Sequence, residues 1–243
     1  CRKYCKNSFL KEVKKICIKN KCLLIFDEVV TGFRYSLGGA QKLYGVTPDI
    51  SCFAKAISNG IPLSAVVGKK KYMKLFNNVF FSFTYGGECL GLAAAKACIN
   101  KLIKKRVLDK IYNNGEIFKN KLNKLIKLYR LEDFFYCDGH PSRTVLTIKS
   151  NKILKFPLVT KTFIQQELLK HGVLWSGYHC ITYTFNKKDI KHVLSAYEKT
   201  FRKIIDIKNK NQNLKKYIKG NLLKKVFTRV ADFQAASLKT YNK

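Results

Sequence analysis

Acidic residues are scarce in this sequence, and so is arginine. Asp and Glu number 15 against 48 Lys and Arg, so the formal net charge is +33 at pH 7. Only seven of those basic residues are Arg, whose planar guanidinium reads bases and grips phosphate in pairs. The shortage of Arg argues against a specific nucleic-acid site, and we expect no such partner. A basic module that binds polyanions in a salt-dependent way is the alternative from another functional class.

The sequence also lacks the spacing of a disulfide framework or a metal site. Its nine cysteines form no CxxC pair and no Cys/His cluster of the zinc type, and its four histidines are scattered. An odd number of cysteines without a framework is typical of a reducing compartment, so we expect a cytoplasmic protein without a metal. No apolar run is long enough to cross a membrane and no secretory signal opens the chain, so we expect no membrane partner.

Short apolar runs that alternate with helical patterns predict an α/β fold followed by a smaller α+β region. Ser8 is the expected N-cap of the first helix, and the Lys/Asn-rich stretch 209–225 is expected to be exposed or frayed. We expect strands at 23–28, within 45–55, and at 64–68, 79–85, 143–149 and 172–176, with helices at 8–20, 89–128, 158–171 and 187–208.

Three local features carry candidate chemistry, and each has a structural alternative. Asp27 and Glu28 end an apolar run, where strand ends in α/β sheets face the ligand crevice; the alternative is a helix N-cap or a salt bridge. Lys55 stands in a mostly apolar segment, where partial burial favours the neutral, nucleophilic amine; the alternative is an ordinary surface lysine. Thr84 shortly precedes the glycine pair of SFTYGGE, which suits a phosphate and equally a plain turn.

The order of these features resembles the class-III aminotransferases, the family that includes glutamate-1-semialdehyde aminomutase. The resemblance spans nearly the whole chain and is most specific over residues 25–68. It is carried by FDEVVTGFR, GGAQKLYGVTPDI, FAKAISNGIPLSAVVG and FTYGGE. Three later segments look most like the aminomutase-like branch: GHPSRTVLTIK, FIQQELLKHGVLWSGYH and YIKGNLLKKVFTRV.

The resemblance implies a fold-type-I transferase that depends on pyridoxal 5'-phosphate. Residues 1–128 would be the C-terminal part of its large domain, and residues 129–243 the small domain with a basic tail. The family's N-terminal portion, which supplies a phosphate loop and a ring-stacking aromatic, has no counterpart in this sequence. We therefore expect a fragment that lacks the N-terminal half and has little or no activity by itself.

The resemblance also implies the site residues. Asp27 would pair with the protonated pyridine nitrogen of the cofactor, and Val29 would pack against its ring. Lys55 would form the Schiff base and then move a proton between substrate and cofactor. Thr84 would reach the cofactor phosphate of a neighbouring subunit, so a homodimer would share the site. The expected reaction moves an amino group from a small amino donor to an aldehyde or keto acceptor; an intramolecular 2,1-aminomutase is the alternative.

A few positions depart from the family pattern or carry only structural expectations. Ala54 and Phe83 stand where many members carry Gly, and the second change bears on the backbone part of the phosphate contact. Glu88 stands where aminomutases carry Asn, which favours the aminotransferase-like branch. Arg34 is expected to be structural. Trp175 and Tyr178 are expected to pack in the core rather than line a substrate entrance.

Overall fold

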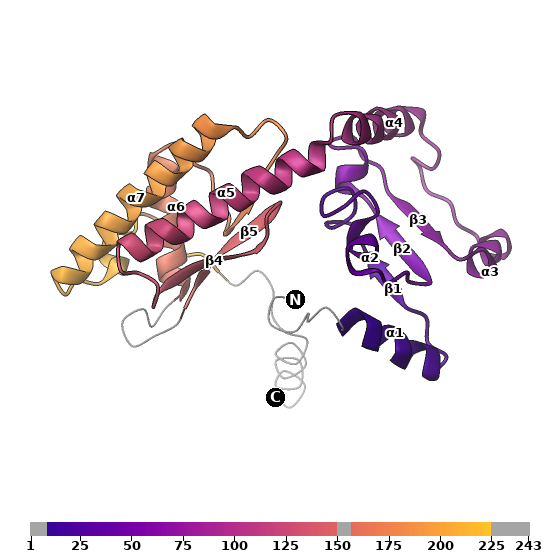
Figure 1. Cartoon of the computed structure of the whole chain (residues 1–243), viewed down its shortest axis with the longest axis horizontal. Helices are drawn as coiled ribbons and strands as arrows, with labels where there is room; N and C mark the ends of the chain where they lie inside the picture. The colour runs from indigo at the N-terminus through magenta and orange to yellow at the C-terminus, as the bar shows by residue number, and fades with distance from the viewer. Residues whose placement is uncertain (1–8, 150–156, 225–243) are drawn as a thin grey trace, which may run out of the picture. The chain divides into compact units, whose positions relative to one another are not determined.

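The computed structural model describes residues 9–149 and 157–224, which divide into two compact units (Figure 1). The first unit holds the described residues up to Lys119 together with Gly139–Thr144 and Cys180–Lys187. The rest of the described chain forms the second unit. The domain boundary predicted between residues 128 and 129 stays a prediction. Ser8 and the basic tail from residue 225 lie outside the described residues.

A three-stranded sheet organises the first unit. Its order is β1-β2-β3, with β2 parallel to β1 and antiparallel to β3 (Figure 1). The strands are β1 (Ile25–Asp27), β2 (Ile50–Phe53) and β3 (Ala65–Gly68). The helices are α1 (Phe9–Lys19), α2 (Gly39–Tyr44), α3 (Lys70–Met73) and α4 (Cys89–Lys104), with 3-10 turns η1 (Lys55–Ile57) and η2 (Lys74–Asn78).

Alternation along β1 decides which of its residues are buried. Leu24 and Phe26 are buried with Val46, and they pack against the apolar face of α1. Side chains on a strand point alternately to opposite faces, so Ile25 and Asp27 fall on the other face and are exposed. The predicted strand 23–28 is thus present in shortened form and ends with its carboxylate outward.

A second sheet, of order β4-β5-β6, accompanies the remaining helices. Its strands are β4 (Phe135–His140), β5 (Arg143–Ile148) and β6 (Tyr178–Cys180). The helices are α5 (Val107–Leu128), α6 (Pro157–Lys170) and α7 (Lys187–Asn209), followed by the 3-10 turn η3 (Leu214–Tyr217). Helix α5 contributes residues to both units.

The predicted helix over 89–128 is two helices, because the backbone breaks between α4 and α5. Arg106 has a φ of +45°, a left-handed conformation that ends a right-handed helix. Helix α5 then buries residues at helical spacing, namely Val107, Ile111, Gly115, Phe118, Leu122 and Ile126. Gly115 is required there, since a Cβ would overlap the carbonyl group of Pro141.

Two predicted strands are wrong. The predicted strand 79–85 is not formed, and the aromatic side chains of residues 79–83 are exposed, with Phe80 at 96%. A high β-propensity does not make a strand without a neighbouring strand to pair with. Residues 172–176 are not a strand either: Gly172, with a φ of +72°, ends α6 in a left-handed cap where Val173 N–H donates to Leu168 O over 3.0 Å.

Aromatic side chains from α6, α7 and β4 form the core of the second unit. Phe163, Tyr197 and Phe201 are fully buried, and Phe135 stacks on Phe201 at 5.6 Å between ring centroids. Trp175 is 3% exposed, as expected of a core residue. Tyr178 was also expected in the core, but it is exposed, so the expectation is wrong for this residue.

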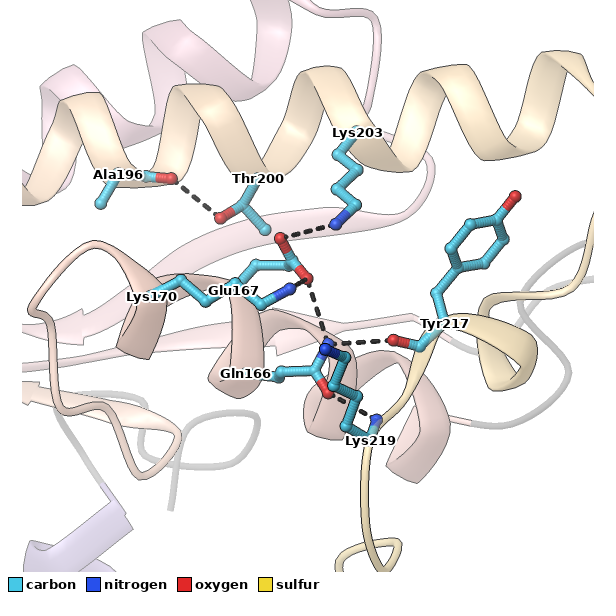
Figure 2. Close-up of polar contacts among 8 residues, drawn as sticks. All are labelled: Gln166, Glu167, Lys170, Ala196, Thr200, Lys203, Tyr217 and Lys219. Carbon is cyan, nitrogen blue, oxygen red and sulfur yellow. Dashed lines mark hydrogen bonds and ion pairs between the residues drawn. The ribbon is translucent and has the colours of Figure 1, made fainter.

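Part of the segment after α7 is bound along α6, so the expectation that 209–225 is exposed or frayed is wrong for Leu214, for 217–218 and for 222–223, which are buried or partly buried. The other described residues of this stretch are exposed, as expected. Figure 2 shows Gln166 contacting this segment through both ends of its amide. Its Nε2 donates to Tyr217 O over 3.0 Å, and its Oε1 accepts from Lys219 N–H over 2.7 Å. Leu223 N–H donates to Thr162 Oγ1 over 3.1 Å. A side-chain amide satisfies backbone groups here as a neighbouring strand would.

Candidate functional site

The sheet register brings the ends of β1 and β2 to one edge. Asp27, the last residue of β1, pairs with Cys52 of the parallel strand β2. Adjacent strands lie about 4.8 Å apart, and parallel strands end at the same edge. Lys55 opens η1, two residues after β2 ends, so it follows at the same edge of the sheet as Asp27. Such an edge, beyond the carboxyl ends of parallel strands, is where α/β proteins bind ligands.

The residues on either side of Lys55 anchor its backbone. Phe53 and Ile57 are buried with Ala95 of α4 in one apolar cluster. Lys55 lies between these two anchors with its side chain exposed. Its φ is +51°, a left-handed conformation that is uncommon for a residue with a Cβ. Arg106 has a similar angle where a helix ends, so this angle describes the main chain at Lys55 and does not by itself indicate a function.

The exposure of Lys55 differs from the partial burial that the sequence predicts. The apolar neighbours that suggested burial are themselves turned into the core, and they leave the lysine outward.

Asp27 and Val29 form a small turn at the end of β1. Val29 N–H donates to Asp27 Oδ1 over 3.0 Å, which holds the exposed carboxylate against the backbone. Val29 is partly buried and lies two residues beyond the carboxylate, so an aliphatic side chain accompanies the anion at the sheet edge.

Glu28 points the other way and has a different task. It is 0% exposed, and it accepts hydrogen bonds from the Thr31 hydroxyl and from the N–H groups of Ala40 and Gln41 at 2.8 and 2.9 Å. The last two donors belong to the first turn of α2, whose N–H groups have no partner within the helix. The helix-capping alternative for the Asp27–Glu28 pair therefore holds for Glu28, and Asp27 takes no part in this cap.

Arg34 and Tyr35, in the loop after β1, contact two other segments of the first unit. Arg34 donates through one guanidinium nitrogen to the carbonyls of Ser142 and Ile181, at 3.0 and 3.3 Å, which confirms its structural role. Tyr35 stacks on His140 at 4.0 Å between ring centroids. Burial lowers the pKa of His140 to about 4, with nearby cations adding to the effect, so the ring is neutral at pH 7.

Thr84 is not brought to Asp27 and Lys55 by the sheet register. It begins the exposed turn 84–87, which precedes α4. Gly87 has a φ of +75°, and Glu88 caps α4 by accepting from Leu90 and Gly91 N–H at 2.5 and 2.6 Å. Both alternatives stay open for this turn: a plain connection, or a hydroxyl presented to a ligand held elsewhere.

Sequence reasoning singled out Asp27 and Lys55, but it did not predict the stack on His140 or the three hydrogen bonds that Glu28 accepts, which we call the Glu28 clamp. The clamp leaves one trace in the sequence, since a strand-ending carboxylate is followed within a short loop by the glycine pair at 38–39. The stack leaves none, because Tyr35 and His140 are far apart in the chain. Within residues 9–149 and 157–224 there is no group of three His, Cys, Asp or Glu that suits a metal ion. No helix in the same ranges has the length and apolar character of a membrane span.

Comparison with known proteins places these residues in a family context. The family model described as aminotransferase class-III matches residues 3–200. A 3-aminobutyryl-CoA aminotransferase from Cloacimonas acidaminovorans (strain Evry) is 34% identical over 202 residues, which are 82% of this chain and 48% of that protein. A glutamate-1-semialdehyde 2,1-aminomutase from Methanospirillum hungatei JF-1 is 39% identical over 200 residues, 79% of this chain and 48% of that protein. The chain spans about half the length of the curated relatives that it matches.

Solved structures resemble the same part of the chain. The FumI protein of Sphingopyxis sp. MTA144, solved in its PLP internal aldimine form, has a TM-score of 0.75 at 20% identity and covers 84% of this chain and 48% of its own. An omega-transaminase from Sphaerobacter thermophilus has a TM-score of 0.72 at 18% identity, over 81% and 48%. At these identities the likeness concerns the fold, and it confirms the expected fold-type-I α/β architecture of a partial large domain followed by a smaller α+β region.

Proposed function

Because the chain belongs to the class-III aminotransferase family, we propose that it carries the catalytic amine of a pyridoxal-phosphate-dependent aminotransferase. The observation that carries this proposal is the parallel register of β1 and β2, in which Asp27 pairs with Cys52 and Lys55 follows closely. An amine and a carboxylate at one sheet edge fit pyridoxal phosphate, whose carbonyl carbon takes a lysine and whose ring nitrogen takes an anion.

The four residues have separate tasks in this proposal. Nζ of Lys55 holds the cofactor covalently and then moves a proton to and from the substrate's α-carbon. The Asp27 carboxylate keeps the ring nitrogen protonated, and Val29 packs on the ring. Pyridoxal phosphate, when bound, supplies the electron sink that makes the proton on the α-carbon acidic. The Thr84 hydroxyl donates to the cofactor phosphate in a second copy of the chain, so that a homodimer shares the site.

The substrates proposed for the whole protein are a small amino donor and an aldehyde or keto acceptor. These proposals concern more polypeptide than this chain, which spans about half of its relatives' length. By itself the chain is expected to have little or no transaminase activity. The term 'complemented protein' means this chain combined with a polypeptide that corresponds to the remaining half of the relatives.

A second candidate is an intramolecular 2,1-amino transfer on one semialdehyde. The 39% identity to a glutamate-1-semialdehyde 2,1-aminomutase favours it. The two candidates share the chemistry of Lys55 and differ in whether a separate donor is consumed. Glutamate-1-semialdehyde supplied alone to the complemented protein is turned over only in the second case.

The residue assignment is tested by trapping the cofactor. The complemented protein is loaded with one equivalent of pyridoxal phosphate, reduced with borohydride and digested, and the phosphopyridoxyl peptide is mapped. We expect one dominant label on Lys55, although the chain contains 41 lysines. A label spread over exposed lysines, or concentrated on another one, refutes the assignment. Asp27→Asn, which keeps the size of the side chain, is expected to lower the share of label on Lys55.

A further inference from the structure

Glu28 is the buried charged group nearest in sequence to the candidate site, and the proposed chemistry does not use it. Its carboxylate receives three donors that come from both ends of one loop. The Thr31 hydroxyl lies at the start of the loop, and the N–H groups of Ala40 and Gln41 lie at its end. Hydrogen bonds to an ionised acceptor are roughly twice as strong as neutral ones, so one side chain closes the loop at both ends.

The pocket for this carboxylate exists only because residue 39 has no side chain. Gly39 has a φ of +70°, which disfavours any residue with a Cβ. A Cβ built at this position would also overlap the Glu28 carboxylate itself. The glycine and the glutamate therefore depend on each other, and a change at either position opens the same clamp.

The clamp also bears on Asp27, because the residue that follows Glu28 donates its backbone N–H to the Asp27 carboxylate. Gly32 N–H donates to Glu28 O over 2.8 Å, and Val29 N–H donates to Asp27 Oδ1 over 3.0 Å. The hydrogen bond that holds the Asp27 carboxylate thus comes from a residue inside the clamped loop. If the loop loosens, Val29 N–H moves and the carboxylate loses the donor that orients it.

We infer that Glu28 is a positioning residue, which fixes the Asp27 carboxylate by clamping the loop after β1 to the start of α2. The inference rests on the proposed function in that Asp27 is the group that meets the cofactor's ring nitrogen. Glu28 itself touches neither cofactor nor substrate. Its effect reaches the cofactor only through the orientation of Asp27, which a general loss of stability would not reproduce.

The test compares Glu28→Gln and Gly39→Ala with Glu167→Gln, which alters a buried glutamate of the second unit. Circular dichroism first establishes that each variant of the full chain folds. The primary measurement is hydrogen exchange at the Val29 amide, followed by NMR without cofactor. Loss of a charged acceptor is expected to speed this exchange about tenfold in the first two variants and to leave it unchanged in the third. The second measurement is the share of phosphopyridoxyl label on Lys55 in the complemented protein.

The two measurements separate the two proposals. Unchanged exchange at Val29 in folded Glu28→Gln overturns the positioning role, whatever happens to the label. Faster exchange with a lower share of label on Lys55 supports it. Faster exchange with an unaltered label also overturns it, because the clamp would then not reach the cofactor. A wild-type protein that fails to label Lys55 sinks the proposed function instead, and Val29 exchange still shows whether Glu28 holds the carboxylate at residue 27.

Discussion

The two units each bury a glutamate, and they hold it with different partners. Glu28 in the first unit accepts from a hydroxyl and two backbone N–H groups. Glu167 in the second is bridged by Lys170 and Lys203, at 2.6 and 3.0 Å, as Figure 2 shows. Those lysine side chains are 43% and 40% exposed, so salt screens the ion pairs, whereas it has little effect on the buried hydrogen bonds that Glu28 accepts from uncharged donors.

This difference indicates that the buried carboxylate has a different role in each unit. The first unit uses its buried carboxylate beside an exposed sheet edge, where Asp27 and Lys55 are presented outward. The second unit uses its carboxylate to join α6 to α7 over an aromatic core. Substitutions at the first edge are expected to change chemistry, and substitutions in the second core to change stability.

The largest effect is expected from removing the amine. Lys55→Ala should lower the activity of the complemented protein by on the order of 10³-fold or more, because covalent attachment and proton transfer are both lost. The free energy of unfolding should change little, since the side chain is exposed. Lys104→Ala, at an exposed position on α4, is the matched control and should keep full activity. Equal losses in both variants would refute the role of Lys55.

A core truncation in the second unit should lower the free energy of unfolding, which the removal of the amine leaves almost unchanged. Phe163→Ala removes a fully buried ring and should cost about 3–5 kcal/mol of unfolding free energy. Urea unfolding followed by the fluorescence of Trp175, the sole tryptophan, reports on this unit. Leu169→Ala, exposed on the same helix, should cost about 0.5 kcal/mol or less. Similar costs for the two variants would contradict the assigned core.

Acid should weaken the second unit through one histidine. Burial lowers the pKa of His179 to about 3, so the fold keeps the ring neutral while the unfolded chain takes up a proton near pH 6.5. Stability is therefore complete above pH 6.5 and falls by about 1.4 kcal/mol per pH unit below it, or about 2 kcal/mol at pH 5. His179→Gln should flatten this slope in Trp175-detected unfolding. A slope that survives the substitution would rule His179 out as its source.

A smaller effect is expected at Glu167. Burial raises its pKa, but hydrogen bonds from Lys170, Lys203 and Gln166 outweigh that effect and lower the pKa below 4.5. Its contribution is thus present above pH 4.5 and is lost as the pH falls through the lowered value. Glu167→Gln should cost about 1–2 kcal/mol at low salt, discounted for the exposure of the lysines, and less at 1 M salt. A salt-independent cost would mean that the ion pairs are not its source.

The spacing of apolar residues along the sequence correctly predicted several strands and helices of this fold. The strand ending in Asp27, the strand before Lys55 and the long helix α7 were all expected from apolar spacing. The strand at 79–85 was not found, because pairing is decided by distant segments that a short window does not contain. Strand β4 was missed for a different reason, since its sequence FYCDGH shows no clear alternation of apolar and polar residues.

The candidate site shows the same limit. The order of Asp27, Lys55 and Thr84 is readable in the sequence, and the parallel register then brings the first two to one edge. The outward position of Lys55 was not readable, because it follows from the burial of Phe53 and Ile57 against α4. The clamp on Glu28 needed the fold as well, since its donors come from two ends of a loop.

The left-handed backbone at Lys55 implies a trade-off between stability and chemistry. A φ of +51° suits glycine, and a residue with a Cβ pays about 1 kcal/mol to adopt it. Lys55→Gly should consequently resist urea better than Lys55→Ala, although neither variant has the amine. Lys55 therefore adopts a less favourable main-chain conformation, which fixes the direction of the main chain at the amine that we propose as the nucleophile.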